Sequence, residues 1–223
     1  MASLSCPEPV GEISHPPIRT RTTRRSALAA VAALMAVGSG TAATAAAAPD
    51  AVAFMNQLLN GAIAILNDKT SPAGRQAKFR EFFQADFDGP GIARFVLGRY
   101  WRSASRDEQQ EFLKLFEEYV VLVYSARLSD FSGERFKVRG SRVDQGAVIV
   151  STDILSPGAA APLKVDWRLV SDDGAFKISD VIVEGISMMV TERSEFASVI
   201  QRHGGQVSGL LSLMREKAAS AAQ

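Results

Sequence analysis

Residues 163–183 read LKVDWRLVSDDGAFKISDVIV, and this stretch decides the fold class. From Leu163 to Leu169 every second side chain is apolar and the others are charged, which is the pattern of a strand with one buried face. The sequence Asp172-Asp173-Gly174 is typical of a hairpin turn, so the chain should return as a neighbouring strand. In that second strand the apolar side chains move from even to odd positions near Ser179-Asp180, which predicts either a β-bulge or a strand covered on both faces.

Two more strands are expected before this hairpin. Phe136 and Val138 alternate with basic residues, and a turn at Asp144-Gln145-Gly146 leads into a β-branched run from Ala147 to Leu155. Ser156-Pro157-Gly158 should end that run, because proline and glycine interrupt regular structure. The most economical arrangement is four antiparallel strands joined by tight turns.

Helical periodicity occupies the chain before and after the strands. Before them, Asp50 is a predicted N-cap, Ser71-Pro72 should open a second helix, and Asp88-Gly89-Pro90-Gly91 should break it. After the strands, Gly204-Gly205 should separate two further helices. The apolar faces of these helices fall within residues 54–66, 79–83, 92–97, 196–200 and 207–214.

The strongest helix signal begins at Ser105. Ser105 and Glu108 form a capping box, in which each side chain accepts a hydrogen bond from the backbone N–H of the other residue. An apolar face then runs from Phe112 to Tyr124. Helices segregated from an antiparallel sheet predict an α+β domain, with N-terminal helices packed on the four-stranded sheet and further helices at the C-terminus.

The N-terminus has the three parts of an export signal. Four arginines between Arg19 and Arg25 precede an uncharged run at 26–38, and Ala45-Ala46-Ala47 offers a cleavage site. The segment TRRSAL at 23–28 also fits a twin-arginine signal, although paired arginines can equally precede the general secretion route. The sequence therefore predicts an export signal at 1–47, a single domain at 48–216 and a frayed tail at 217–223.

Composition disfavours several function classes. The chain carries 25 basic and 24 acidic side chains, so it lacks the net basic field of a nucleic-acid binder. Its single cysteine, Cys6, lies inside the predicted signal, which leaves the mature chain without a disulfide, a thiolate nucleophile or a cysteine metal ligand. We therefore predict no nucleic-acid partner, no metal site and no cofactor.

Candidate catalytic groups are sparse. The predicted mature chain has one histidine, His203, next to a predicted helix C-terminus, where the helix dipole favours a polar or positively charged side chain. The sequence contains no Gly-x-Ser-x-Gly elbow of the kind that presents a catalytic serine. Two carboxylate pairs, Asp86 with Asp88 and Asp180 with Glu184, keep a carboxylate-dependent enzyme as an alternative, although such residues are commoner as caps and solvated surface. We predict no catalytic residues and no enzymatic activity.

Aromatic side chains are frequent, with 12 phenylalanines that fall mainly on the expected helices. Such residues build either a packed core or the wall of an apolar cavity, which is the usual form of a ligand site. Composition alone does not separate these two arrangements.

Several segments carry a resemblance to a known family. They read REFF at 80–83, FD at 87–88, LGRYW at 97–101 and DVIVEGIS at 180–187, followed by Arg193 and Phe196. In this order the chain resembles the MlaC family of periplasmic phospholipid shuttles, also called the toluene-tolerance or auxiliary organic-solvent-tolerance family, and its hopanoid-associated branch is similar. Two positions depart from the family pattern, Thr191 in place of asparagine and Phe131 in place of tyrosine.

The resemblance implies that the protein binds and transports a lipid and catalyses no reaction. Such proteins carry a phospholipid through the periplasm between an outer-membrane lipoprotein complex and an inner-membrane ABC transporter with an MCE subunit, and so maintain outer-membrane lipid asymmetry. A hopanoid or another polycyclic lipid is an alternative cargo. An accessory protein with a fully packed core is a further alternative.

A lipid carrier of this fold should enclose an apolar pocket between helices and sheet. We expect its wall to come from hydrophobic residues on both, and arginines near its mouth to meet the head group or docking partners. The predicted wall residues are Phe83, Val96, Trp101, Phe112, Phe116, Val148, Val150, Val165, Trp167, Val181 and Val183, and the predicted arginines are Arg99, Arg102 and Arg193.

Overall fold

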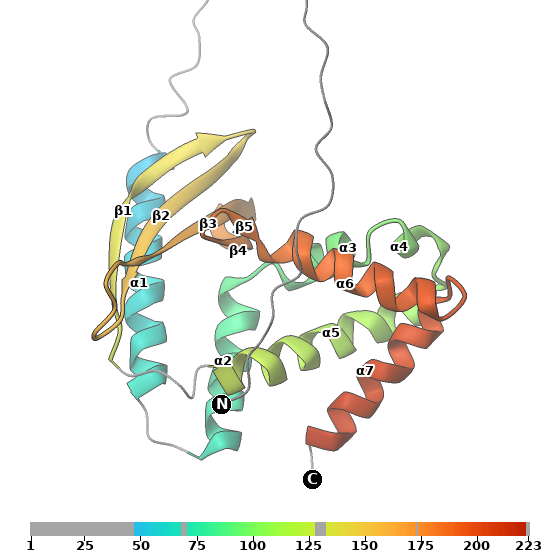
Figure 1. The fold of residues 1–223 in the computed structure, drawn as a ribbon. Helices are drawn as coiled ribbons and strands as arrows, with labels where there is room; N and C mark the ends of the chain where they lie inside the picture. The colour runs from blue at the N-terminus through green and yellow to red at the C-terminus, as the bar shows by residue number, and fades with distance from the viewer. Residues whose placement is uncertain (1–46, 68–70, 128–132, 173, 222–223) are drawn as a thin grey trace, which may run out of the picture. The chain divides into compact units, whose positions relative to one another are not determined.

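A computed structural model describes residues 47–67, 71–127, 133–172 and 174–221, which contain helices and one antiparallel sheet (Figure 1). The predicted α+β class is confirmed. In chain order the elements are α1 (Ala47–Asn67), α2 (Pro72–Asp86), α3 (Gly89–Leu97), α4 (Tyr100–Ser103), α5 (Arg106–Arg127), β1 (Arg135–Asp144), β2 (Ala147–Leu155), β3 (Leu163–Asp172), β4 (Ala175–Val183), β5 (Ile186–Ser187), α6 (Met188–Arg202) and α7 (Val207–Ala221).

The sheet is an antiparallel meander in the order β1-β2-β3-β4-β5. The four expected strands are present, and the described part of the chain adds a short fifth strand. Glu184 and Gly185 both take positive φ, 48° and 82°, so a two-residue turn folds Ile186 back beside Val183. The fifth strand was missed because two residues show no alternation.

A β-bulge in β4 sets which side chains face inward. Arg168 pairs with Asp180, whereas the next residue, Leu169, pairs with Ile178, so Ser179 is the extra residue. The bulge that the change of period predicts is therefore confirmed. It places Ile178 and Val181 against the same hydrophobic cluster although they are an odd number of residues apart.

Helix boundaries follow the capping side chains. Ser71 caps α2 by accepting a hydrogen bond from the Gly74 N–H at 3.2 Å, and the predicted capping box of α5 joins Ser105 and Glu108 at 2.8 and 3.2 Å. The predicted break after α2 is present but short, because Asp88 accepts from the Gly91 N–H at 2.9 Å and starts α3 at once.

The first and last helices extend further toward the chain ends than the sequence predicts. Helix α1 begins at Ala47, so Asp50 lies in its first turn and is not its N-cap. Helix α7 continues to Ala221, so the predicted tail is helical over its described part. Residues 1–46 of the predicted export signal, and Phe131, lie outside the described residues. Within the described ranges, no helix combines the length and apolar character that crossing a bilayer requires.

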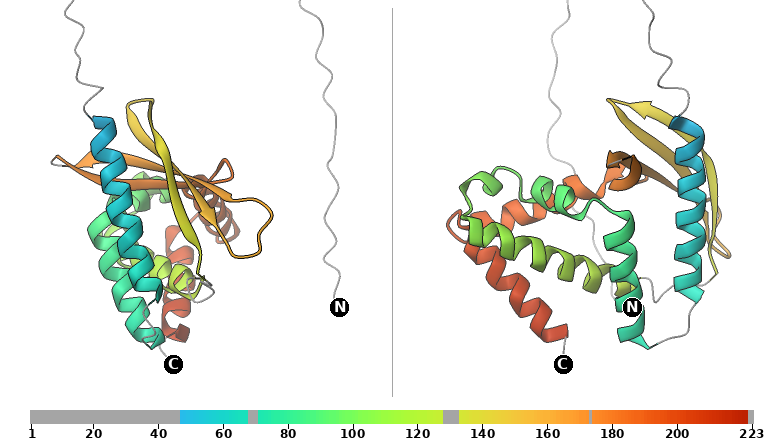
Figure 2. Two further views of the ribbon diagram at one scale, coloured as in Figure 1. Left: turned by 90° about the vertical axis from the view of Figure 1, so that its left-hand side faces the viewer. Right: turned by 180° about the vertical axis from the view of Figure 1, so that it is seen from behind.

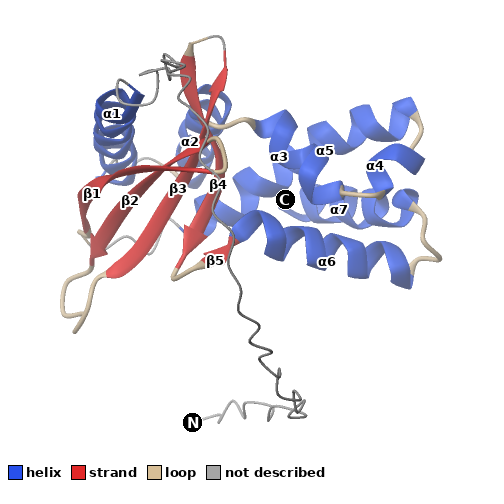
Figure 3. Ribbon diagram, turned by 90° about the horizontal axis from the view of Figure 1, so that it is seen from above, coloured by secondary structure: helices blue, strands red, loops and turns tan. Residues whose placement is uncertain are grey.

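The described residues form two hydrophobic cores. In the first, α3 to α7 pack around Phe112, Phe196 and Leu211. In the second, α1 lies along β1 and β2, and its Met55 packs with Leu169 of the sheet (Figure 2). Seen from above, α3 to α7 gather beyond β4 and β5, away from α1 (Figure 3).

Two short connections join the core of helices to the core of the sheet. After α2, the Asp88 N–H donates to the Ile178 carbonyl at 2.9 Å, while the Phe87 ring packs against both cores. At the other connection, the buried Asp180 carboxylate of β4 accepts from the Ser187 hydroxyl at 2.6 Å and from the Met189 N–H at 3.1 Å. The Asp180 side chain thus fixes the start of α6 to the sheet.

Asp180→Ala should lower the free energy of unfolding by about 1–3 kcal/mol, because the half-buried Ser187 hydroxyl and Met189 N–H lose their acceptor. Urea unfolding measures this change. Asp180→Asn keeps one acceptor oxygen and should lose less. Ser194→Ala, which removes an exposed hydroxyl bound to the Val190 carbonyl within the same helix, is the control. Equal stabilities of the Asp180→Ala and Ser194→Ala variants would contradict the structural role of Asp180.

Candidate functional site

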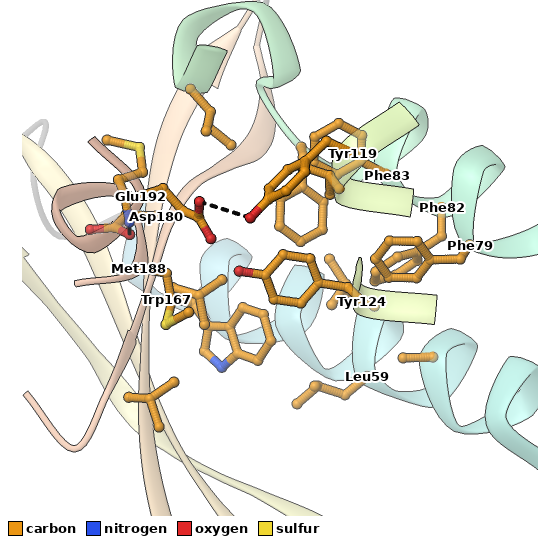
Figure 4. A pocket seen from close by; sticks show the side chains of 18 of the residues that line it. Leu59, Phe79, Phe82, Phe83, Tyr119, Tyr124, Trp167, Asp180, Met188 and Glu192 are labelled. Carbon is orange, nitrogen blue, oxygen red and sulfur yellow. Dashed lines mark hydrogen bonds between the residues drawn. The ribbon is translucent and has the colours of Figure 1, made fainter. Parts of the chain in front are cut away.

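A cavity of about 510 Å³ lies between the two cores (Figure 4). Side chains from α1, α2, α3, α5, α6 and from strands β1 to β4 contribute to its wall, together with the α2–α3 connection. The lining residues are Leu58, Leu59, Ala62, Ile65, Phe79, Phe82, Phe83, Phe87, Ile92, Val96, Phe116, Tyr119, Val120, Tyr124, Phe136, Ile154, Trp167, Asp180, Val181, Val183, Met188, Met189 and Glu192.

The wall is aromatic on the α2 side. The Phe82 and Phe87 ring centroids are 5.8 Å apart, and those of Phe83 and Phe87 are 5.1 Å apart. On the sheet, the Trp167 indole N–H donates to the Thr152 hydroxyl at 2.9 Å. Because the polar atom of the indole is already bonded, its ring faces are left to apolar contacts.

The few polar groups lie together at the side of the cavity near α6. The Tyr119 hydroxyl donates to Glu192 Oε2 at 3.2 Å, and Figure 4 shows the Tyr124 hydroxyl directed toward the same region. Burial raises the pKa of Tyr119 well above its ordinary value, and the negative charge of Glu192 raises that pKa further. The raised pKa keeps the Tyr119 hydroxyl protonated, and able to donate, at pH values where an ordinary tyrosine ionises.

Six of the eleven predicted wall residues line this cavity: Phe83, Val96, Phe116, Trp167, Val181 and Val183. They come from α2, α3, α5, β3 and β4, so the expectation that helices and sheet both contribute agrees with the structure. Their contact with a lipid remains a proposal.

The other five predicted wall residues do not line the cavity. Phe112 is fully buried in the core of helices, with its ring centroid 6.0 Å from that of Phe196. Val148 and Val150 pack in the sheet core that contains α1, and Val165 is buried outside the cavity. Trp101 packs at the edge of the helix core, where Arg94 lies 5.6 Å from its ring centroid. The period of a strand identifies its inner face but not which part of that face a helix covers.

The three predicted arginines also lie away from the cavity wall. Arg99 donates to the Tyr100 hydroxyl at 2.8 Å, and Arg102 is exposed on α4. Arg193 lies 5.0 Å from the Phe95 ring centroid and packs against Gly98, where a β-carbon would come within 2.8 Å of the guanidinium. A role for these arginines at the mouth of the cavity or in docking stays a prediction.

None of the predicted wall residues lies on α1 or α6, although both helices contribute to the cavity lining. The spacing of Leu58, Leu59 and Ala62 marks an apolar helix face, which is the signal that could have placed α1 at the site. Met188 and Met189 give no such signal, because they are the first two residues of α6, which begins directly after β5.

The candidate catalytic groups have structural partners. Asp180 holds the start of α6, and Glu184 accepts from the Lys164 N–H at 2.7 Å in an exposed turn. His203 caps the end of α6, with Nδ1 2.8 Å from the Val199 carbonyl oxygen. Burial raises the pKa of Asp86, which lies outside the cavity lining. Among the described residues, no cluster of three or more His, Cys, Asp or Glu side chains is arranged to hold a metal ion.

An α+β domain with an apolar cavity between two cores has the construction of a protein that binds an apolar ligand. Residues 56–216 match the family model described as MlaC protein, and the chain belongs to this family. The resemblance carried by the sequence motifs is thereby confirmed.

Two curated relatives are similar to parts of the chain. The intermembrane phospholipid transport system binding protein MlaC of Haemophilus influenzae is 23% identical over 127 residues, which cover 55% of this chain and 58% of the relative. The toluene tolerance protein ttg2D of Pseudomonas putida is 25% identical over 121 residues, which cover 54% and 56%. The chain thus matches a little over half the length of these relatives.

A solved structure shares the fold. It is that of a phospholipid-binding protein from Ralstonia solanacearum in complex with a phospholipid, with a TM-score of 0.66 and 21% sequence identity. The match covers 78% of this chain and 99% of that chain.

The raised pKa of Tyr119 predicts that stability falls as the pH rises above about 10, the ordinary tyrosine value. Above this pH the unfolded chain releases the tyrosine proton while the folded chain retains it, so the unfolded state is favoured. Tyr119→Phe removes this contribution and should make the free energy of unfolding fall less steeply between about pH 9 and 11. Urea unfolding across that range measures both slopes, and parallel slopes would contradict the raised pKa of Tyr119.

Proposed function

We propose that this protein binds a phospholipid in the cavity and carries it through the periplasm. The observation that supports this most directly is the cavity itself, which is walled by aromatic and aliphatic side chains from both cores. The names of the Haemophilus relative and of the Ralstonia structure, which refer to phospholipid transport and phospholipid binding, support the same ligand class.

The energetics of such a carrier come from hydrocarbon burial. Each methylene removed from water is worth about 0.8 kcal/mol, so a sixteen-carbon chain exposes about 13 kcal/mol of unfavourable hydration. The aromatic side of the wall, with Phe82, Phe83 and Phe87, and the sheet side, with Trp167 and Val181, offer that chain a dry surface. No covalent step is needed for this task.

The head group belongs outside the apolar part of the cavity. Among the described lining residues the charged side chains are the carboxylates of Asp180 and Glu192, and lysine and arginine are absent. A phosphate transferred into this wall would lose its hydration without meeting a cation, which is costly. We therefore place the acyl region inside and the phosphate at the opening.

The wider role follows the family. We propose that residues 1–47 export the chain to the periplasm, that 48–216 form the single carrier domain, and that cleavage occurs near Ala47. We further propose that the protein exchanges phospholipid with an inner-membrane ABC transporter bearing an MCE subunit and with an outer-membrane lipoprotein complex, and so maintains outer-membrane lipid asymmetry.

The two tryptophans provide a matched test of where the lipid binds. Trp167 lines the cavity, whereas Trp101 packs against the core of helices and is not among the lining residues. A phospholipid with brominated acyl chains should therefore quench the fluorescence of the Trp101→Phe variant, in which Trp167 is retained. It should leave the Trp167→Phe variant, in which Trp101 is retained, nearly unchanged.

Fluorescence titration with brominated and unbrominated phospholipid separates quenching from a change in conformation. Equal quenching of the two variants, or quenching of Trp101 alone, would contradict binding in this cavity. Absence of quenching in the wild-type protein, despite normal folding by circular dichroism, would contradict the carrier function.

A further inference from the structure

The outer surface of α3, α4 and α6 carries a local excess of positive charge. Residues 89–105, which include α3 and α4, contain three arginines and no aspartate or glutamate. These arginines, Arg94, Arg99 and Arg102, are exposed, and so is Arg193 of α6. Figure 1 shows α3, α4 and α6 along one side of the core of helices, with α7 on the opposite side.

The arginine of α6 lies directly against α3. The guanidinium carbon of Arg193 is 5.0 Å from the Phe95 ring centroid, and a β-carbon at Gly98 would come within 2.8 Å of its Nε. Val190 precedes Arg193 by three residues on the same side of α6 and is 53% exposed, while Phe95 is 37% exposed. Basic groups of the two helices thus adjoin a small apolar surface. We refer to Arg94, Phe95, Arg99, Arg102, Val190 and Arg193 as the α3–α6 face.

Aromatic rings, rather than carboxylates, lie beside these arginines. Arg94 is 5.6 Å from the Trp101 ring centroid, and Arg99 is 4.9 Å from the Tyr100 ring centroid while donating to its hydroxyl at 2.8 Å. Within the described ranges, no carboxylate forms an ion pair with an arginine of the α3–α6 face. A guanidinium that stacks on a ring keeps N–H donors for a second, anionic partner.

Other arginines of the chain are paired with acids. Arg80 lies 2.7 Å from a glutamate of α5, and Arg142 lies 2.7 Å from an aspartate of β3. The two acids of α6, Glu192 and Glu195, are directed toward α5: burial raises the pKa of Tyr119 there, and the charges of both glutamates raise it further. The positive charge of the α3–α6 face is therefore left without a partner of opposite sign in the described part of the chain.

We propose that the α3–α6 face docks on the surface of an anionic phospholipid bilayer. Arginine donors suit the phosphate groups of such a surface, and exposed apolar side chains among basic ones are the composition of segments that bind at a membrane interface. The inference goes beyond the proposed function, because it assigns the surface with which the protein approaches a membrane. It uses none of the residues that line the cavity.

Cosedimentation with vesicles tests this surface. We expect the wild-type protein to bind vesicles of phosphatidylglycerol mixed with phosphatidylcholine, to bind more weakly as salt is added, and not to bind vesicles of phosphatidylcholine alone. Each arginine near an anionic bilayer strengthens binding about fivefold. The variant with Arg94→Gln and Arg102→Gln should therefore bind the anionic vesicles about 25-fold more weakly.

Two further variants separate the face from net charge and from folding. Arg135→Gln with Lys137→Gln removes two exposed positive charges from β1, which Figure 3 shows at the far edge of the sheet from α3 and α6, and should leave binding nearly unchanged. Arg94→Lys with Arg102→Lys keeps the charge of the face and should retain most of the binding.

Equal binding of the wild-type protein to both kinds of vesicle would overturn the inference, and so would an equal loss in the two double glutamine variants. The inference also fails if the wild-type protein ignores anionic vesicles but binds immobilised poly-glutamate through Arg94 and Arg102, because the face would then recognise an acidic protein.

Discussion

The apolar inner face of the sheet is larger than α1 can cover, and the site is a consequence of that mismatch. Helix α1 packs on the part of the face near Leu169 and Ile178, whereas Val181 and Val183 border the cavity. The remaining helices do not fill the gap, because they form their own core around Phe112. The lining of an empty apolar cavity lacks the dispersion contacts that neighbouring side chains would provide. An apolar ligand in the cavity would supply those contacts and so stabilise the folded protein.

Two short connections hold the core of helices and the core of the sheet at a fixed separation, with the cavity between them. The Asp88 N–H bonds to the Ile178 carbonyl, and the Asp180 carboxylate bonds to Ser187 and to the first turn of α6. This gives the segment DVIVEGIS at 180–187 a physical meaning: the aspartate is the acceptor, Glu184-Gly185 is the left-handed turn, and the serine is both donor and N-cap. The most distinctive motif of the chain thus maintains the cavity's geometry, with Asp180 itself in the wall.

The sequence predicts local structure here better than it predicts the site. The capping box at Ser105, the bulge at Ser179 and the α+β class follow from hydrogen-bonding chemistry and from periodicity, both of which are local. The wall depends on which part of each apolar face is covered, which is a property of tertiary packing. Val150 and Val181 have the same pattern in their strands, yet only Val181 borders the cavity, because α1 covers the other.

The most direct test of the central claim is native mass spectrometry of the protein purified from a bacterial periplasm, followed by solvent extraction and identification of the bound lipid. The account predicts a stoichiometric phospholipid whose acyl region lies in the cavity. A co-purifying hopanoid would contradict the assigned cargo while retaining the cavity as the binding site. Well-folded protein that is free of lipid, and that takes none from phospholipid vesicles, would contradict the account.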